Sequence, residues 1–204
     1  DEAEAAMADL NVRTERVTEP FLPIFPRVLG PSFQTLPDAV VATHLTADIS
    51  RWQGRASVRR GSSRWSRLLG WIFGFPPAGE DIPVKVTKTV TRAGETWERR
   101  FGARGFRSRL AATPEGMTES FGPFTFLLGL KVQDGRLHYP VLSGRLGPLP
   151  LPRWLLPVSV AQEYAVGDDF HFDVKLMAPV TGELLVHYQG GLGAARRDAP
   201  GVPL

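Results

Sequence analysis

The chain has 204 residues, 43% hydrophobic and 22% charged, which fits an ordinary globular domain and excludes a disordered chain. It contains no cysteine, which excludes disulfides, thiolate metal sites and a thiol nucleophile. The 24 basic residues include four lysines, so the other 20 are arginines, and no basic run is longer than two residues. We therefore do not expect nucleic-acid binding. No leader segment or spanning apolar stretch is visible, and we expect a cytoplasmic protein.

The chain divides into four parts. Residues 1–6 precede Met7 and are interpreted as a cloning remnant. Their exclusion changes the formal net charge from +3 to +6, because three of the 21 acids lie in this stretch and 18 remain against 24 bases. Residues 7–24 carry no periodic pattern and are predicted to be a flexible arm. Residues 25–192 are predicted to form a single β domain, and residues 193–204 a frayed tail.

The first elements are predicted to be helical. Between residues 27 and 44 apolar side chains recur at steps of three and four, which predicts two short helices with Pro37 in the first turn of the second. The period changes to two over residues 52–59, which indicates a half-buried strand. Residues 64–75 then predict a helix with a large apolar face, ended by Pro76 and Pro77.

Period two dominates the rest of the chain. We predict further strands at 84–90, 97–101, 106–110, 117–121, 124–132, 137–142, 158–166, 170–177 and 183–192. Residues 133–136 (Gln-Asp-Gly-Arg) are typical of a tight hairpin turn. The proline-rich residues 146–157 lack ladder donors and predict a crossing loop or short helical turn.

About ten strands joined by tight turns predict a mainly β fold. We expect a long antiparallel meander that is curled into a barrel or a strongly bent sheet, because a long meander must hide its edges. Short N-terminal helices and a helical insert after the first strand complete it. This arrangement is similar to the calycin or fatty-acid-binding type.

No catalytic or metal-binding motif is present, and we assign no catalytic residue, metal or cofactor. His171 and Asp173 form the one pair of histidine and carboxylate at strand spacing. They are an acid/base pair or a pair of metal ligands, or else two exposed polar residues on the wet face of a half-buried strand, and we favour the last interpretation. Glu163 on a late strand either faces inward and orients a ligand or projects outward without a role. These three residues remain the weak catalytic candidates.

Arginines are dense on two neighbouring predicted strands. Arg107 and Arg109 share a strand face, and Arg99 lies on the next strand, so together they could hold a phosphate or carboxylate. Alternatively, they form a solvated face paired with glutamates, and we favour this interpretation. The glutamates in question are Glu95, Glu98 and Glu119.

The aromatic-rich segment 64–75 allows three interpretations. The helix plugs the core, or it covers an open mouth and lines a cavity for an apolar ligand, or it faces outward. In the last case Trp65 and Trp71 with Arg64 and Arg67 suit peripheral contact with a membrane interface. We favour the interpretation that the helix plugs the core, we rank the cavity for an apolar ligand second, and we favour membrane contact least. The candidate ligand-binding residues are Trp65, Leu68, Leu69, Trp71, Ile72, Phe73, Phe126, Leu128, Phe172, Tyr188 and Arg153.

Several phrases together resemble a bacterial domain of unknown function, DUF4166. They include Phe25–Gly30, Trp97–Gly102, Leu149–Trp154 and Phe170–Val174, and the resemblance spans roughly Phe25 to Leu192. It implies no activity and no catalytic residue, since the family has none assigned. Similar domains also occur attached to oxidoreductase-like domains, which implies an accessory module.

The leading hypothesis is a non-catalytic binding module with a hydrophobic small molecule or lipid inside a β barrel. This rests on analogy of fold. The alternatives are an enzyme of unassigned chemistry acting on an apolar substrate, and an accessory partner of an oxidoreductase.

Overall fold

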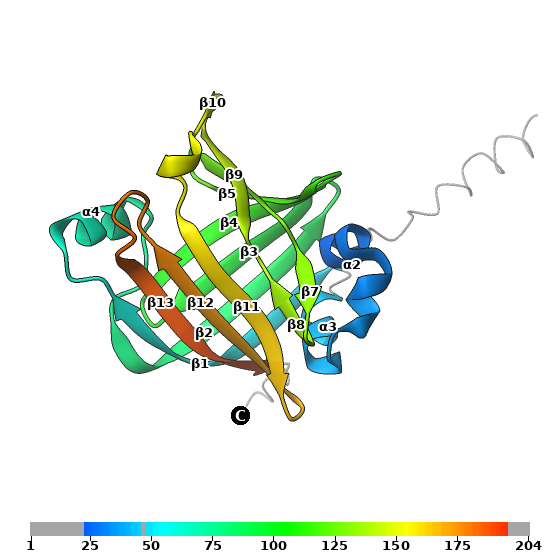
Figure 1. The fold of residues 1–204 in the computed structure, drawn as a ribbon. Helices are drawn as coiled ribbons and strands as arrows, with labels where there is room; N and C mark the ends of the chain where they lie inside the picture. The colour runs from blue at the N-terminus through cyan, green and yellow to red at the C-terminus, as the bar shows by residue number, and fades with distance from the viewer. Residues whose placement is uncertain (1–22, 46–47, 196–204) are drawn as a thin grey trace, which may run out of the picture.

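The computed structural model describes residues 23–45 and 48–195 (Figure 1). Residues 1–6, interpreted above as a cloning remnant, and most of the predicted arm and tail lie outside these ranges. The chain first forms helix α2 (Ile24–Leu29), the 3-10 helix η1 (Gly30–Thr35) and helix α3 (Asp38–His44). The two expected short helices are thus present, with η1 between them. Pro37 immediately precedes α3 instead of lying in its first turn, and its carbonyl accepts hydrogen bonds from Val40 and Val41.

All strand pairs in the described residues are antiparallel, and thirteen strands form one sheet. The strands are β1 (Ile49–Arg60), β2 (Gly79–Thr91), β3 (Gly94–Phe101), β4 (Arg104–Thr113), β5 (Gly116–Phe121), β6 (Phe124–Leu128), β7 (Lys131–Gln133), β8 (Arg136–His138), β9 (Val141–Leu146), β10 (Leu149–Pro150), β11 (Val158–Val166), β12 (Asp169–Met177) and β13 (Leu184–Ala194). A mainly β fold is therefore confirmed. α2 begins inside the range predicted as an arm, and β13 runs two residues into the predicted tail, where Ala194 pairs with Trp52 of β1.

The sheet is strongly bent but not closed. Its hydrogen-bonded order is β10-β9-β6-β5-β4-β3-β2-β1-β13-β12-β11-β8-β7, which has two ends. The expected barrel closure and calycin-like fold are therefore not confirmed. The long hairpin from β6 to β9 supplies strands near both ends of this order. Its β6 pairs with β9 and with β5 near one end, whereas its β8 pairs with β11 and with β7 at the other end.

Two predicted strands are each divided into two. The strand expected at 124–132 is interrupted after Leu128, and that at 137–142 is interrupted at Tyr139 and Pro140. Pro140 has no N–H for a ladder, and its carbonyl instead accepts a hydrogen bond of 2.9 Å from the Gly129 amide. The hairpin turn between β7 and β8 lies where it was expected. Asp134 and Gly135 both have positive φ, as a tight primed turn requires.

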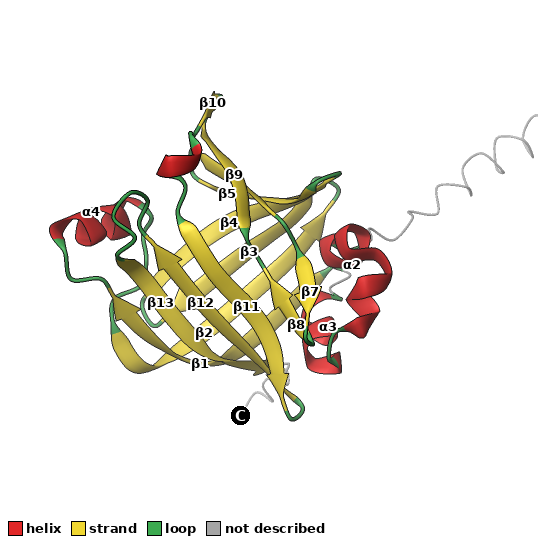
Figure 2. Ribbon diagram, viewed as in Figure 1, coloured by secondary structure: helices red, strands yellow, loops and turns green. Residues whose placement is uncertain are grey.

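Helices cover opposite ends of the bent sheet (Figure 2). α2, η1 and α3 lie at one end, and α4 (Arg64–Ile72) lies at the other as the insert between β1 and β2. Ser63 caps α4, since its hydroxyl accepts a 2.9 Å hydrogen bond from the Ser66 amide. The proline-rich crossing contains β10 and a short 3-10 helix, η2 (Arg153–Leu155). No helix in the described ranges is long and apolar enough to cross a membrane.

Candidate functional site

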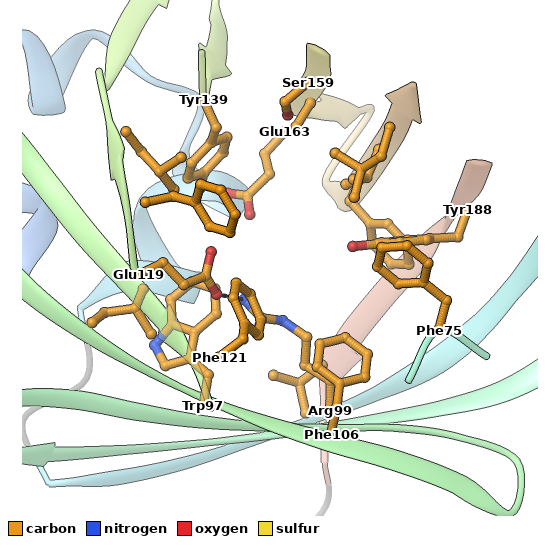
Figure 3. A pocket seen from close by; sticks show the side chains of 18 of the residues that line it. Phe75, Trp97, Arg99, Phe106, Glu119, Phe121, Tyr139, Ser159, Glu163 and Tyr188 are labelled. Carbon is orange, nitrogen blue, oxygen red and sulfur yellow. Dashed lines mark hydrogen bonds and ion pairs between the residues drawn. The ribbon is translucent and has the colours of Figure 1, made fainter. Parts of the chain in front are cut away.

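The concave face of the sheet lines a cavity of about 200 Å³ (Figure 3). Its walls come from both halves of the sheet, β2–β6 and β11–β13, and from the residues that follow α4. Aromatic and aliphatic side chains make most of the wall. They include Phe73, Phe75, Trp97, Phe101, Phe106, Phe121, Phe126, Leu128, Phe172 and Leu176. An apolar cavity of about 150 Å³ can hold a benzene molecule, so this space is large enough for an organic ligand.

A histidine and a carboxylate meet at the end of the cavity that is covered by α3. His44, the last residue of α3, is 2% exposed, and its Nε2 lies 2.5 Å from Oε2 of Glu163 on β11. The hydroxyl of Tyr139 lies 3.5 Å from the same His44 nitrogen. Figure 3 shows the Glu163 carboxylate directed into the cavity beside Tyr139.

Charge at this pair is set by burial and by neighbouring groups. Burial, with Lys88 nearby, lowers the pKa of His44 and outweighs the opposing effect of Glu163. Burial raises the pKa of Glu163, but His44, Lys88 and Tyr139 outweigh it and leave that pKa below its ordinary value. The arrangement is therefore a neutral imidazole that donates from Nε2 to an ionised carboxylate. This leaves His44 Nδ1 as a buried acceptor without a partner among the described residues.

A lysine lies inside the sheet next to this pair. Lys88 is 2% exposed, its Nζ donates to the Thr43 carbonyl at 2.7 Å, and it lies 4.0 Å from the centre of the Trp97 ring. Burial lowers its pKa to about 8, against the attraction of Glu163 and Glu95. Buried charges are rare unless they are paired or functional, and the Lys88 ammonium is compensated here by the carboxylates of Glu163 and Glu95.

A second polar group lies further along the wall. Arg99 donates to Glu119 at 3.1 Å and to the Ser108 hydroxyl at 2.8 Å, and Ser108 donates to the same Glu119 oxygen at 2.7 Å. The Tyr188 hydroxyl opposite has no hydrogen-bond partner among the residues described, and burial raises the pKa of Tyr188 to about 12. Figure 3 shows this hydroxyl pointing into the cavity. It is a free donor for a ligand.

The candidate residues separate into two sets. The cavity is lined by Glu163 and by Phe73, Phe126, Leu128, Phe172 and Tyr188, whereas Arg153 is exposed elsewhere. Five candidates on α4 do not reach the cavity. Of these Trp65, Leu68, Trp71 and Ile72 are exposed and Leu69 is half-buried.

α4 packs on the sheet through its small residues, which explains why its large side chains face outward. Ser66 and Gly70 are its buried positions. The Ser66 hydroxyl donates to the Leu184 carbonyl at 2.7 Å, and the Arg60 guanidinium fills the space where a Gly70 side chain would lie. The helix therefore does not plug the core. Only the residues after it, Phe73 and Phe75, turn into the cavity.

His171 and Asp173 do not form a pair with each other and do not line the cavity. Asp173 instead accepts a 2.8 Å hydrogen bond from His187 on β13, and Arg59 donates to the other nitrogen of His187. His171 stacks on Tyr164, with 5.8 Å between ring centres. Both residues lie on the outer face of the sheet, away from the cavity.

The predicted arginine group is split between the two faces of the sheet. The register of β3 and β4 places Arg99 opposite Phe106 on the inner face and Glu98 opposite Arg107 on the outer face. Arg107 pairs there with Glu98. The expected pairing with glutamates is present, but as one inner and one outer pair instead of one solvated face.

Sequence reasoning did not single out His44, Lys88 or Tyr139. Lys88 carried a signal, because it follows Val84 and Val86 in the inward alternation of its strand. His44 and Glu163 are 119 residues apart, so no local spacing could have joined them.

Three comparisons place the chain among known proteins. No curated protein matches it. One solved structure that it resembles is a protein of unknown function from the DUF3598 family of Nostoc punctiforme PCC 73102, with 15% identity and a TM-score of 0.42. The match covers 72% of this chain and 47% of that one, so this chain spans about half of its length. The sequence profile of DUF4166, a domain of unknown function, matches residues 36–192, and the chain therefore belongs to the DUF4166 family.

Proposed function

We propose that the protein is a non-catalytic binding module that holds a hydrophobic small molecule or lipid inside its bent sheet. The observation on which this proposal rests is the mainly apolar cavity of about 200 Å³ inside the bent sheet. Protein interiors are close-packed, so a space of this size inside the sheet is unusual and is large enough to receive an organic ligand. A ligand that fills it would recover contacts that the protein alone does not make.

The polar groups of the wall favour a neutral or donor-bearing ligand over a fatty-acid anion. Lys88 and Arg99 contribute two positive charges to the wall, and Glu163 and Glu119 contribute two negative charges, so the wall is balanced when His44 is neutral. A ligand carboxylate would add an unpaired charge in a poorly solvated site, whereas a hydroxyl would find carboxylate acceptors.

A second candidate function is an enzyme acting on an apolar substrate, with Glu163 as the base. The observation that favours it is the Glu163 carboxylate, which accepts a hydrogen bond from His44 and points into the cavity. The resemblance to domains attached to oxidoreductases supports a third proposal, an accessory role beside such an enzyme.

Binding can be tested with dodecanol and dodecanoate, which share a chain and differ in charge. Titration followed by intrinsic tryptophan fluorescence, to which Trp97 of the cavity wall contributes, should report saturable binding of dodecanol and weaker binding of dodecanoate. Ala161→Phe, which fills the cavity, should abolish binding, whereas Gln162→Phe on the outer face of the same strand should leave it unchanged. Native mass spectrometry of protein from its own host should show a retained small molecule.

The outcomes separate the parts of this proposal. Tighter binding of dodecanoate would overturn the ligand class and leave the binding function standing. Binding of neither probe, with no retained molecule, would overturn the binding function itself. Turnover of a retained substrate that stops in Glu163→Gln would favour the enzyme.

A further inference from the structure

We infer that the end of the molecule that carries α4 is a docking surface for anionic lipid membranes. This docking rim consists of α4 with its flanking residues, 62–75, and of most of β9 with the crossing that leads to β11, residues 142–157. Its exposed apolar side chains include Trp65, Leu68 and Trp71 on α4 and Leu149 and Trp154 on the crossing. Trp71 is 79% exposed, and Leu149 and Trp154 are each 66% exposed. Grouped apolar exposure of this kind marks an interaction surface.

The two segments of the docking rim are neighbours in space. Phe73, directly after α4, lies 4.9 Å from Phe124 between ring centres, and Phe124 pairs with Leu146 of β9. Figure 1 shows α4 and the β10 tip at the same end of the sheet, away from α2 and α3. One flat partner can therefore contact both segments.

The charge of the docking rim identifies the partner. The two segments contain four arginines, Arg64, Arg67, Arg145 and Arg153, and neither aspartate nor glutamate. All four are exposed, and none forms an ion pair with a described residue. The nearest acids along the chain, Glu80 and Asp81, accept hydrogen bonds from Ser57 and Arg55. Tryptophan and arginine together are typical of the interface with anionic lipid.

The packing of α4 supports contact in the plane of the membrane. Ser66 and Gly70 fix one side of the helix to β13 and to Arg60, so the opposite side is held outward. Both segments also end in the cavity wall, at Phe75 and at Pro157. If the proposed binding function holds, the docking rim places the cavity next to the lipid phase from which an apolar ligand would come.

Vesicle sedimentation tests this inference. We expect the protein to sediment with vesicles of mixed phosphatidylglycerol and phosphatidylcholine, less with phosphatidylcholine alone, and less at high salt. Arg67→Gln and Arg153→Gln should each weaken partitioning about five-fold. The double variant Trp71→Ser with Trp154→Ser should weaken it at least about ten-fold on both vesicle types, since apolar insertion is lost.

Matched controls lie away from the docking rim. Val166→Ser, at the opposite end of β11, and Arg109→Gln, on the outer wall, should partition like the unchanged protein. Equal partitioning of all variants, or none by the unchanged protein, would overturn the inference. So would a dimer in sedimentation velocity that Trp71→Ser breaks, since the partner would then be a second copy. Ala161→Phe should retain vesicle binding, which separates this test from that of the cavity.

Discussion

Glu163 Oε2 lies 2.5 Å from His44 Nε2, which joins the end of α3 to the middle of β11 inside the sheet. Each residue alone would be a poorly solvated polar group at the closed end of the cavity. Together with Lys88, they form a group of buried polar side chains whose hydrogen bonds require α3 to be packed against the sheet. The N-terminal helices are therefore part of the candidate site and do not merely cover the sheet.

The first prediction concerns the carboxylate of this pair. Glu163→Gln should lower the free energy of unfolding by about 3 kcal/mol, because it removes the carboxylate that attracts the buried Lys88 charge most strongly. The outer pair offers a matched comparison, since Asp173 accepts from His187 as Glu163 does from His44. Asp173→Asn should lower stability by about 1 kcal/mol or less. Urea unfolding of both variants measures this, and equal losses would contradict the assignment of a buried charge network.

The second prediction concerns pH and Lys88. Its pKa of about 8 in the folded protein lies below the ordinary value of 10.5. Between these values the unfolded chain holds a proton that the folded protein does not, so the contribution of Lys88 to stability rises as pH increases from 8 to 10.5. Urea unfolding across this range should show a rise that Lys88→Met removes. Lys85→Met, on the exposed face of the same strand, should keep it.

The strands could be predicted because alternation follows directly from the pleat of a half-buried sheet. The inward positions Phe126, Leu128 and Phe172 were identified in this way. Alternation does not say where a strand is interrupted, so the breaks at Gly129 and Pro140, which divide one hairpin between two regions of the sheet, were not predicted. They depend on which strands become neighbours.

The orientation of α4 and the polar end of the cavity also depend on tertiary packing. A helix with a large apolar face is expected to bury it, but α4 buries Ser66 and Gly70 because Arg60 occupies the space beneath it. Tyr139 lies beside the strand break at Pro140 and had no periodic signal. At this polar end Glu163 was identified from the sequence as a candidate inward-facing group, and Lys88 could have been, since it continues an inward series.

The third prediction concerns the close approach of β1 and β13. A side chain at Gly54 would place its Cβ 1.8 Å from the Gly191 carbonyl oxygen, a backbone atom that cannot move without breaking the ladder. Gly54→Ala should therefore lower the free energy of unfolding by about 3 kcal/mol or prevent folding. Gly193→Ala on β13 has nothing within 4 Å of its Cβ and should change stability by less than about 0.5 kcal/mol. Thermal unfolding of both variants tests the difference.

The fourth prediction joins stability to the docking rim through Val180, at the turn between β12 and β13. Val180 has φ of 70° and is 75% exposed, an unfavourable conformation and setting for a β-branched residue. Val180→Asn should raise the free energy of unfolding by about 1 kcal/mol, because asparagine tolerates this conformation better. The turn lies next to the Ser66 contact of α4, so we expect the same substitution to weaken partitioning into anionic vesicles. Val166→Asn, at the far end of β11, should do neither. A stabilised variant that partitions as well as the unchanged protein would show that the strained valine serves no contact with lipid.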